Sequence, residues 1–241
     1  EWTRFFSWLS FGKGRLSSLK ADLGGPLDRL SGPVSFKSEK AVLEGFPVTG
    51  LAGRLTVADG NRMDLEASGK WLETPFTATA KVTVDEEKRT ETLLAIKSEK
   101  LDLKSAGGAF APGLKLSGAG TGSLDVKYPF SGSFSLSGSM SVPKLSVADK
   151  NAGKLSAAFT MEGEILKIGS ASLSLPGGGT LTAKGSLSGL SGNRPVMALE
   201  GEGKSIPWAF IESLALPSPS PGLSGSADLR WSTNSPLAAP S

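Results

Sequence analysis

The stretch from Gly153 to Gly189 reads GKLSAAFTMEGEILKIGSASLSLPGGGTLTAKGSLSG, and most of its apolar residues recur at every second position. Successive side chains of a β-strand point to opposite faces of the sheet, so this period of two predicts strands with one apolar and one polar face. The apolar residues fall into runs that are separated by turn sequences, of which Gly177-Gly178-Gly179 is the clearest. The sequence therefore predicts consecutive strands joined by short turns.

The same alternation extends from this stretch back to about residue 30. Leu55 and Val57 lead up to Asp59-Gly60, a dipeptide typical of a two-residue hairpin turn, and Met63 continues the phase beyond it. The tripeptide Leu-Ser-Gly occurs six times between such runs, at irregular spacing. We therefore expect an all-β chain with loops of variable length rather than a solenoid of fixed period.

Two segments depart from this pattern and predict helices. Apolar residues at helical spacing from Trp2 to Leu9, resumed by Leu16 and Leu19, predict a helix over about residues 2–20, within a helical segment or linker that spans 1–29. A second, short helix is expected over about residues 205–214.

The second helix is predicted from its expected cap and from its apolar face. Ser205 can cap it and Pro207 suits its first turn, while Trp208, Ile211 and Leu214 share one face. Pro217 and the prolines that follow it end this helix.

Composition excludes several functions. The chain has no Cys and no His, which excludes Cys nucleophiles, Cys/His zinc sites and Ser-His-acid triads within it. Its 26 basic and 23 acidic residues are spread along the chain, whereas nucleic-acid binding calls for a concentrated basic face. Gly203-Lys204-Ser205 lacks the leading glycine of a phosphate-binding loop, because Ala198 stands there. We therefore expect no enzymatic activity, no cofactor, no metal and no nucleic-acid partner.

The order of elements resembles the AsmA-like superfamily of bacterial envelope proteins, which includes TamB. The resemblance rests on residues 153–189, on MALEGEGKSIPWAFIESLAL at 197–216 and, after a Pro-rich break, on GLSGSADLRW at 222–231. It extends more loosely over residues 30 to 236. It implies a long, strongly curved antiparallel sheet that forms an open half-pipe with an apolar concave face. Because the chain begins at Glu1 and ends in a Pro/Ser-rich tail, we expect an interior fragment of a longer protein.

The resemblance also implies a function and a location. The chain would be a non-enzymatic conduit that binds phospholipid acyl chains in its groove and carries lipid between the inner and outer membranes. It would lie in the bacterial periplasm, anchored to the inner membrane through a segment absent from this sequence. Its partners would be phospholipids, adjacent segments of the same long chain and outer-membrane assembly proteins that bind through other regions.

We expect four segments along the chain: the helical segment 1–29, a first β-groove unit over 30–104, a second over 105–204, and a final segment over 205–241. The final segment would hold the short helix, the Pro-rich break and the start of a further β-unit. Strand phase assigns the lining of the lipid groove. The predicted lining residues are Val126, Phe134, Leu136, Met140, Leu155, Phe159, Met161, Leu173, Leu175, Leu181 and Leu187.

One alternative stays open. In an extracellular structural or adhesive β-repeat protein, the same alternating strands would close into a sandwich with a dry core. Both architectures place one apolar face on each strand, so the pattern does not separate them.

Overall fold

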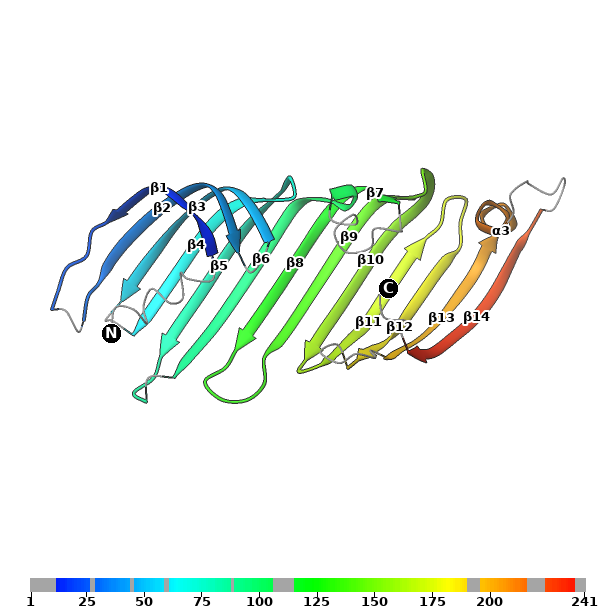
Figure 1. Ribbon diagram of the computed structural model, residues 1–241. Helices are drawn as coiled ribbons and strands as arrows, with labels where there is room; N and C mark the ends of the chain where they lie inside the picture. The colour runs from blue at the N-terminus through cyan, green and yellow to red at the C-terminus, as the bar shows by residue number, and fades with distance from the viewer. Residues whose placement is uncertain are drawn as a thin grey trace. The chain divides into compact units, whose positions relative to one another are not determined.

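A computed structural model describes residues 12–26, 29–43, 46–58, 61–87, 89–105, 115–189, 196–215 and 224–236. It confirms the predicted all-β class, because the strands belong to a 14-stranded antiparallel sheet that does not close on itself (Figure 1). The chain forms two compact units. Unit 1 comprises residues 1–106 and 123–134, and unit 2 comprises residues 107–122 and 135–241.

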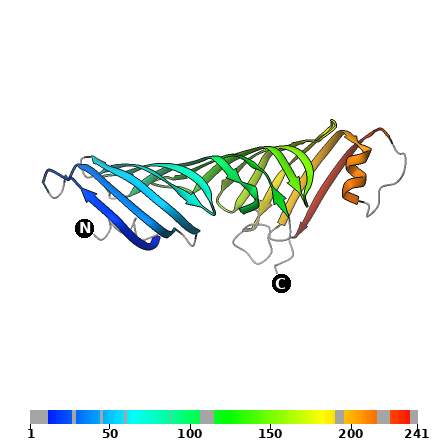
Figure 2. The same ribbon diagram turned by 90° about the horizontal axis from the view of Figure 1, so that it is seen from above.

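Unit 1 is a meander of antiparallel strands. Each strand pairs with the next one along the chain, in the order β1-β2-β3-β4-β5-β6 and then β8. Figures 1 and 2 show that strands of this unit bend along their length, so its sheet is curved rather than flat. The strands are β1 Gly12–Ala21, β2 Gly32–Leu43, β3 Phe46–Ala58, β4 Arg62–Trp71, β5 Thr74–Val84, β6 Thr90–Asp102 and β8 Ala119–Tyr128, of which the last begins in unit 2.

Unit 2 repeats the meander, in the order β9-β10-β11-β12-β13-β14, and the two-residue strand β7 pairs with β9. One helix, α3, stands between β13 and β14 in the chain. The elements are β7 Leu116–Ser117, β9 Ser135–Val147, β10 Lys150–Glu162, β11 Ile165–Ser174, β12 Thr180–Ser188, β13 Val196–Pro207, α3 Trp208–Ala215 and β14 Ser226–Pro236.

The predicted first helix is wrong for residues 12–20, because they belong to strand β1; residues 2–11 lie outside the described part of the chain. Leu16 pairs with Ser38 and Leu19 pairs with Phe36, and two register shifts lie in β1 around these positions. Since Ser38 and Phe36 are two residues apart on β2, the shifts place Leu16 and Leu19 on the same sheet face although they are three residues apart. The bulges in β1 thus give Leu16 and Leu19 the i, i+3 spacing that is typical of a helix face.

The second helix is confirmed, but it begins later than predicted. α3 spans Trp208–Ala215, whereas Ser205 and Pro207 belong to the end of β13. Ser205 has a φ of 51° and its amide donates to Asp228 Oδ1 at 2.7 Å, within a register shift between β13 and β14. Ser205 therefore lies in a bulge instead of capping the helix. Inside α3, the Trp208 indole Nε1 donates to Glu212 Oε1 at 3.1 Å.

The core of unit 1 lies on one face of its sheet, near the β3–β4 hairpin. Leu55, Val57, Met63 and Val82 are buried there, with Leu23, Val34 and Leu65 packed against them. Val57 pairs with Met63 and Met63 pairs with Val82 across successive strands. Ala58 pairs with Arg62, so three residues separate the paired ends of β3 and β4, one more than in the two-residue turn that Asp59-Gly60 predicted. Asp59 and Gly60 themselves lie outside the described part of the chain.

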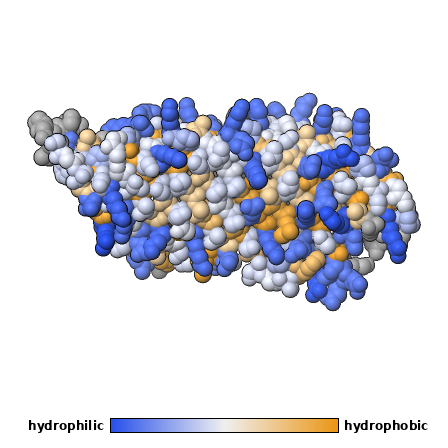
Figure 3. All heavy atoms as spheres, turned by 180° about the vertical axis from the view of Figure 1, so that it is seen from behind, coloured by the Kyte–Doolittle hydropathy of each residue, from blue (hydrophilic) through white to orange (hydrophobic). Residues whose placement is uncertain are grey.

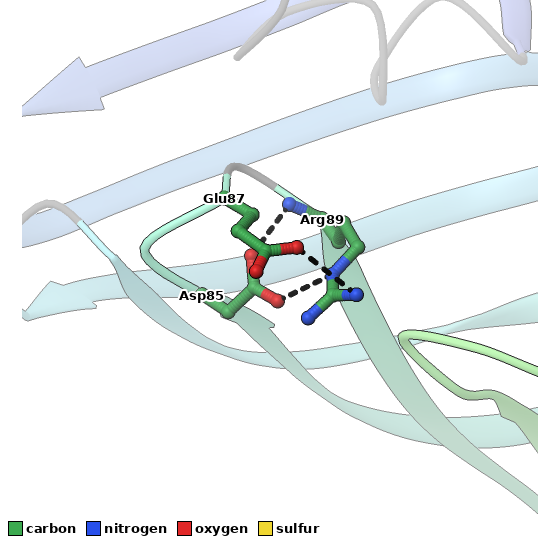
Figure 4. Close-up of polar contacts among 3 residues, drawn as sticks. All are labelled: Asp85, Glu87 and Arg89. Carbon is green, nitrogen blue, oxygen red and sulfur yellow. Dashed lines mark hydrogen bonds and ion pairs between the residues drawn. The ribbon is translucent and has the colours of Figure 1, made fainter.

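The β5–β6 hairpin ends in a network of charges (Figure 4). Asp85 accepts hydrogen bonds from the Arg89 backbone N at 2.8 Å and from Arg89 Nε at 2.7 Å, and Arg89 Nη1 lies 3.1 Å from Glu87 Oε2. Desolvation opposes ionisation of Asp85, but the hydrogen bonds and the positive charge of Arg89 outweigh it, and the pKa of Asp85 falls below its usual value. The ionised carboxylate of Asp85 therefore stabilises the β5–β6 turn.

A close approach of two strands depends on Gly153. Its φ is 109°, and a Cβ at this position would collide with the carbonyl oxygen of Ser174 on β11. Any other residue would combine backbone strain with a steric clash against main-chain atoms.

We expect Gly153→Ala to lower the free energy of unfolding by about 2 to 4 kcal/mol, the sum of left-handed backbone strain and overpacking. Chemical denaturation measures this. Gly169→Ala is the matched control, because the nearest atom to its Cβ would be Ala158 O at 3.9 Å, and we expect a change within about 0.5 kcal/mol. Equal losses in the two variants would contradict this account.

We expect Arg89→Gln to lower the melting temperature at neutral pH. Asp85 has a lowered pKa in the folded state, so its contribution is present above the usual carboxyl pKa and is lost as the pH falls through the lowered value. The difference in melting temperature between the variant and the original protein should therefore vanish in strong acid. Thermal unfolding at about pH 7 and about pH 2 tests this. Lys154→Gln, at an exposed position of β10, is the control; a difference that persists unchanged in acid would rule out Asp85 as the partner.

Candidate functional site

The strand register of unit 2 gathers apolar and small residues on one face, in four rows that cross β9 to β14. Residues that pair across an antiparallel ladder share a face, so each row can be followed from strand to strand. We call this set the apolar face of unit 2. Its rows are Val142-Leu155-Leu173-Leu181-Gly203-Leu229, Met140-Ala157-Ala171-Ala183-Gly201-Trp231, Gly138-Phe159-Ile168-Gly185-Leu199-Thr233 and Leu136-Met161-Leu166-Leu187-Met197-Ser235.

The other face of unit 2 carries mostly Ser, Thr, Lys and Glu. A typical row there runs Ser141-Ser156-Ser172-Thr182-Glu202-Arg230. Figure 3 views the molecule from the side opposite to Figure 1 and shows hydrophilic side chains dispersed among intermediate and hydrophobic ones, not gathered into one patch. The two faces of the sheet in unit 2 thus differ sharply in polarity.

One row of the apolar face consists of small residues, which rise less far above the sheet than the residues of the neighbouring rows. Ala157, Ala171, Ala183 and Gly201 follow one another across β10 to β13. The row on one side of them carries Leu155, Leu173 and Leu181, and the row on the other side carries Phe159, Ile168 and Leu199. The side chains of this row are shorter than those of the rows on either side, and we call the row the furrow; at Gly201 the ring of Trp231 covers it.

Glycines make room for aromatic rings on this face. Gly138 pairs with Phe159, and Gly201 pairs with Trp231. A Cβ at either glycine would collide with the ring of its partner, so each ring lies over the glycine opposite. The rings therefore lie low over the neighbouring strand.

The apolar face remains partly open to solvent. Of its residues only Val142 and Gly203 are buried, whereas the others are half-buried and Trp231 is 38% exposed. In the part of the chain that the structure describes, no second sheet packs over unit 2. A side chain in a dry core would be almost fully buried, so this face is available for an apolar ligand.

The eleven predicted lining residues fall into three groups. Eight lie in the rows of the apolar face: Leu136, Met140, Leu155, Phe159, Met161, Leu173, Leu181 and Leu187. Leu175 is buried and lies just after β11, where its amide donates to Gly179 O at 3.1 Å. Val126 and Phe134 belong to unit 1, with Val126 half-buried in β8. Phe134 precedes β9 and its ring centroid lies 4.8 Å from that of Tyr128.

The sequence-based list omitted two kinds of residue. The first kind is small: Ala157, Ala171 and Ala183 are in phase with the predicted residues but carry little apolar surface. The second kind is hidden by a register shift, because the pairing of β10 with β11 shifts between Ala158 and Phe159 and moves Ile168 onto the same face as Ala171. A glycine opposite an aromatic residue was the signal that could have fixed the register in advance.

Unit 1 has an apolar face of the same design. Leu19, Phe36, Gly53, Ala67, Ala78 and Ile96 form one row across β1 to β6. Phe36 lies over Gly53 as Phe159 lies over Gly138. The edge residues of β1 are exposed, Leu16 by 51% and Leu19 by 56%.

A pocket of about 280 Å³ lies between β13 and β14, lined by Glu202, Gly203, Lys204, Asp228, Leu229 and Arg230. Glu202 is 3.5 Å from Arg230 and 4.0 Å from Lys204, and Asp228 accepts the hydrogen bond from Ser205 N. Nearby, a hydrogen bond to Glu200 and its negative charge raise the pKa of Lys184. These charges hold the bulged strand pair together and leave no charge of one sign in excess.

Other site types find no support in the described residues. They contain no group of three or more acidic side chains placed to hold a metal ion. None of the helices within the described ranges is long and apolar enough to cross a membrane.

Comparisons with known proteins identify no relative. The chain matches no protein-family model, no curated protein and no solved structure.

Proposed function

We propose that this chain is a non-enzymatic lipid-binding protein whose apolar face in unit 2 holds phospholipid acyl chains during transport between two membranes. The observation that supports it is an apolar face that crosses six strands and stays open to solvent. A soluble protein rarely leaves such a surface uncovered unless a ligand or partner binds there.

The dimensions of the face suit an acyl chain. Neighbouring strands lie about 4.8 Å apart, so a row across β9 to β14 spans roughly 24 Å. One leaflet of a bilayer has a hydrocarbon thickness of about 15 Å, half of the core. The small residues Ala157, Ala171, Ala183 and Gly201 cross β10 to β13, which is roughly 14 Å of that row, so an acyl chain in the furrow would extend over Met140 or Trp231 at its ends.

The chemistry of the face suits movement along it. Each methylene that leaves water contributes about 0.8 kcal/mol, wherever along the furrow it lies. The furrow carries no polar side chain that would hold a chain at one position. Binding is therefore favourable overall and nearly uniform along the row, as a conduit requires.

The resemblance to AsmA-like proteins supports a wider proposal. On this resemblance we propose that the chain lies in the bacterial periplasm, anchored to the inner membrane through another segment of a longer polypeptide. Its further partners would be adjacent segments and outer-membrane assembly proteins.

The alternative is an adhesive β-repeat with a dry core. The half-buried state of Leu155, Leu173 and Phe159 favours the lipid-binding proposal, because a sandwich would bury these side chains fully.

We expect Phe159→Asp and Leu173→Lys to abolish lipid binding while the protein stays folded. A charge on an open face can remain hydrated, but an acyl chain cannot pass over it without stripping that water, which costs several kcal/mol. The measurement pairs thermal unfolding with mass spectrometry of co-purified lipid. Unfolding of both variants would favour the closed core, and undiminished lipid would remove these residues from the path.

We expect Ala171→Phe to reduce co-purified lipid at least several-fold, because its ring would fill the furrow. Ser156→Phe places the same ring at an exposed position on the polar face and is the matched control. The two proteins should have similar melting temperatures. Equal lipid content in the two variants would show that the furrow does not hold acyl chains.

A further inference from the structure

The loop between β8 and β9 gathers three aromatic side chains of unit 1, two of them at its ends. Tyr128 ends β8, Phe130 follows it, and Phe134 closes the loop before β9. The rings of Tyr128 and Phe134 have centroids 4.8 Å apart and are tilted by 39°. Tyr128 is 54% exposed, and Phe130 and Phe134 are half-buried. We call Tyr128, Phe130 and Phe134 the aromatic tip.

The aromatic tip lies in an uncharged stretch of the chain. No Asp, Glu, Lys or Arg occurs from residue 128 to residue 143. Several other connections carry charge, as at Asp85 to Arg89, Asp149 and Glu164. The β11–β12 connection is uncharged too, but it holds no aromatic residue. The tip also holds the only tyrosine of the chain. An exposed aromatic cluster without charge is unfavourable in water, and loops of soluble proteins normally end in polar residues.

We propose that the aromatic tip inserts into the headgroup region of a lipid bilayer. Rings with an apolar body and a polar edge are enriched at that depth, and tyrosine is among the residues that occur there most. The ring contact between Tyr128 and Phe134 holds two of the three side chains together before insertion, which reduces the entropy lost on binding.

The charges beside the tip determine which bilayer it fits. Lys127 Nζ lies 3.6 Å from Glu91 Oε1, which places the start of β6 and the charged hairpin of Asp85 beside the end of β8. This part of the sequence carries four acidic residues, Asp85, Glu86, Glu87 and Glu91, and three basic ones, Lys88, Arg89 and Lys127. These charges give no attraction to anionic lipid. The tip therefore binds through apolar contact, and a zwitterionic bilayer suffices.

This inference goes beyond the proposed function, because it concerns contact with a membrane rather than lipid held on unit 2. The chain has no Cys, so single cysteines can be labelled uniquely. Ser131→Cys in the loop would carry an environment-sensitive fluorophore, and Glu99→Cys, at an exposed position on β6, is the matched control. The probe is a phosphatidylcholine vesicle.

With vesicles, we expect a blue shift and quenching by shallow spin-labelled lipid for Ser131→Cys, and neither for Glu99→Cys. Replacing Tyr128, Phe130 and Phe134 together with Ser should reduce vesicle binding at least tenfold. The conservative Phe130→Trp should keep it, and circular dichroism checks that each variant is folded. Raising the salt concentration should leave binding unchanged, because the contact is apolar.

No shift for Ser131→Cys at excess vesicle, an equal shift for Glu99→Cys, or release of the original chain by salt would each overturn the proposal. Co-purified lipid, measured separately by mass spectrometry, reports on the apolar face of unit 2. The triple variant should retain that lipid, so a failure of the aromatic tip and a failure of the proposed function give different results.

Discussion

The hydrogen-bond register between neighbouring strands determines which side chains share a face of this sheet. A shift by one residue would exchange the apolar and polar faces of a strand, because side chains alternate with a period of two. In unit 2 the register keeps Leu155, Leu173 and Leu181 in one row across three strands. Ile168 and Ala171 are three residues apart on β11, yet they lie on the same face of the sheet, because a bulge between them absorbs the extra residue.

The many glycines of the chain serve packing as well as turns. Gly138 and Gly201 lie inside strands, each opposite an aromatic residue, and neither has space for a Cβ under the ring that covers it. Glycine within a strand is normally destabilising, since it loses backbone entropy and has no side chain to pack. Here the neighbouring ring covers the exposed backbone and recovers apolar contact. The same arrangement of Phe36 over Gly53 in unit 1 indicates a shared rule of construction.

Much of this architecture could be predicted from the sequence, because alternation reports the face directly wherever a strand is regular. The phase of Leu155, Phe159 and Leu181 placed them correctly on one face. Prediction failed where a bulge changed the number of residues between two positions on the same face. Leu16 and Leu19 have the spacing of a helix, although both residues lie on strand β1. It also missed the furrow, because alanine carries little hydrophobic signal in a sequence and only the register aligns Ala157 with Ala171. Backbone bulges and small residues leave weak sequence signatures, and both are decisive at this site.

An open apolar face raises a conflict between ligand binding and solubility, and the composition of the rows resolves it. A face of large side chains alone would favour association with any other apolar surface. Alternating rows of large and small residues instead leave a furrow about one side chain wide, which fits a thin, flexible acyl chain better than a broad protein surface. The opposite face, rich in Ser, Thr, Lys and Glu, keeps unit 2 hydrated. Under the proposed function, a narrow row of small apolar residues on a strongly polar sheet would select a chain-like ligand by shape, without a pocket that would hold the ligand in one place.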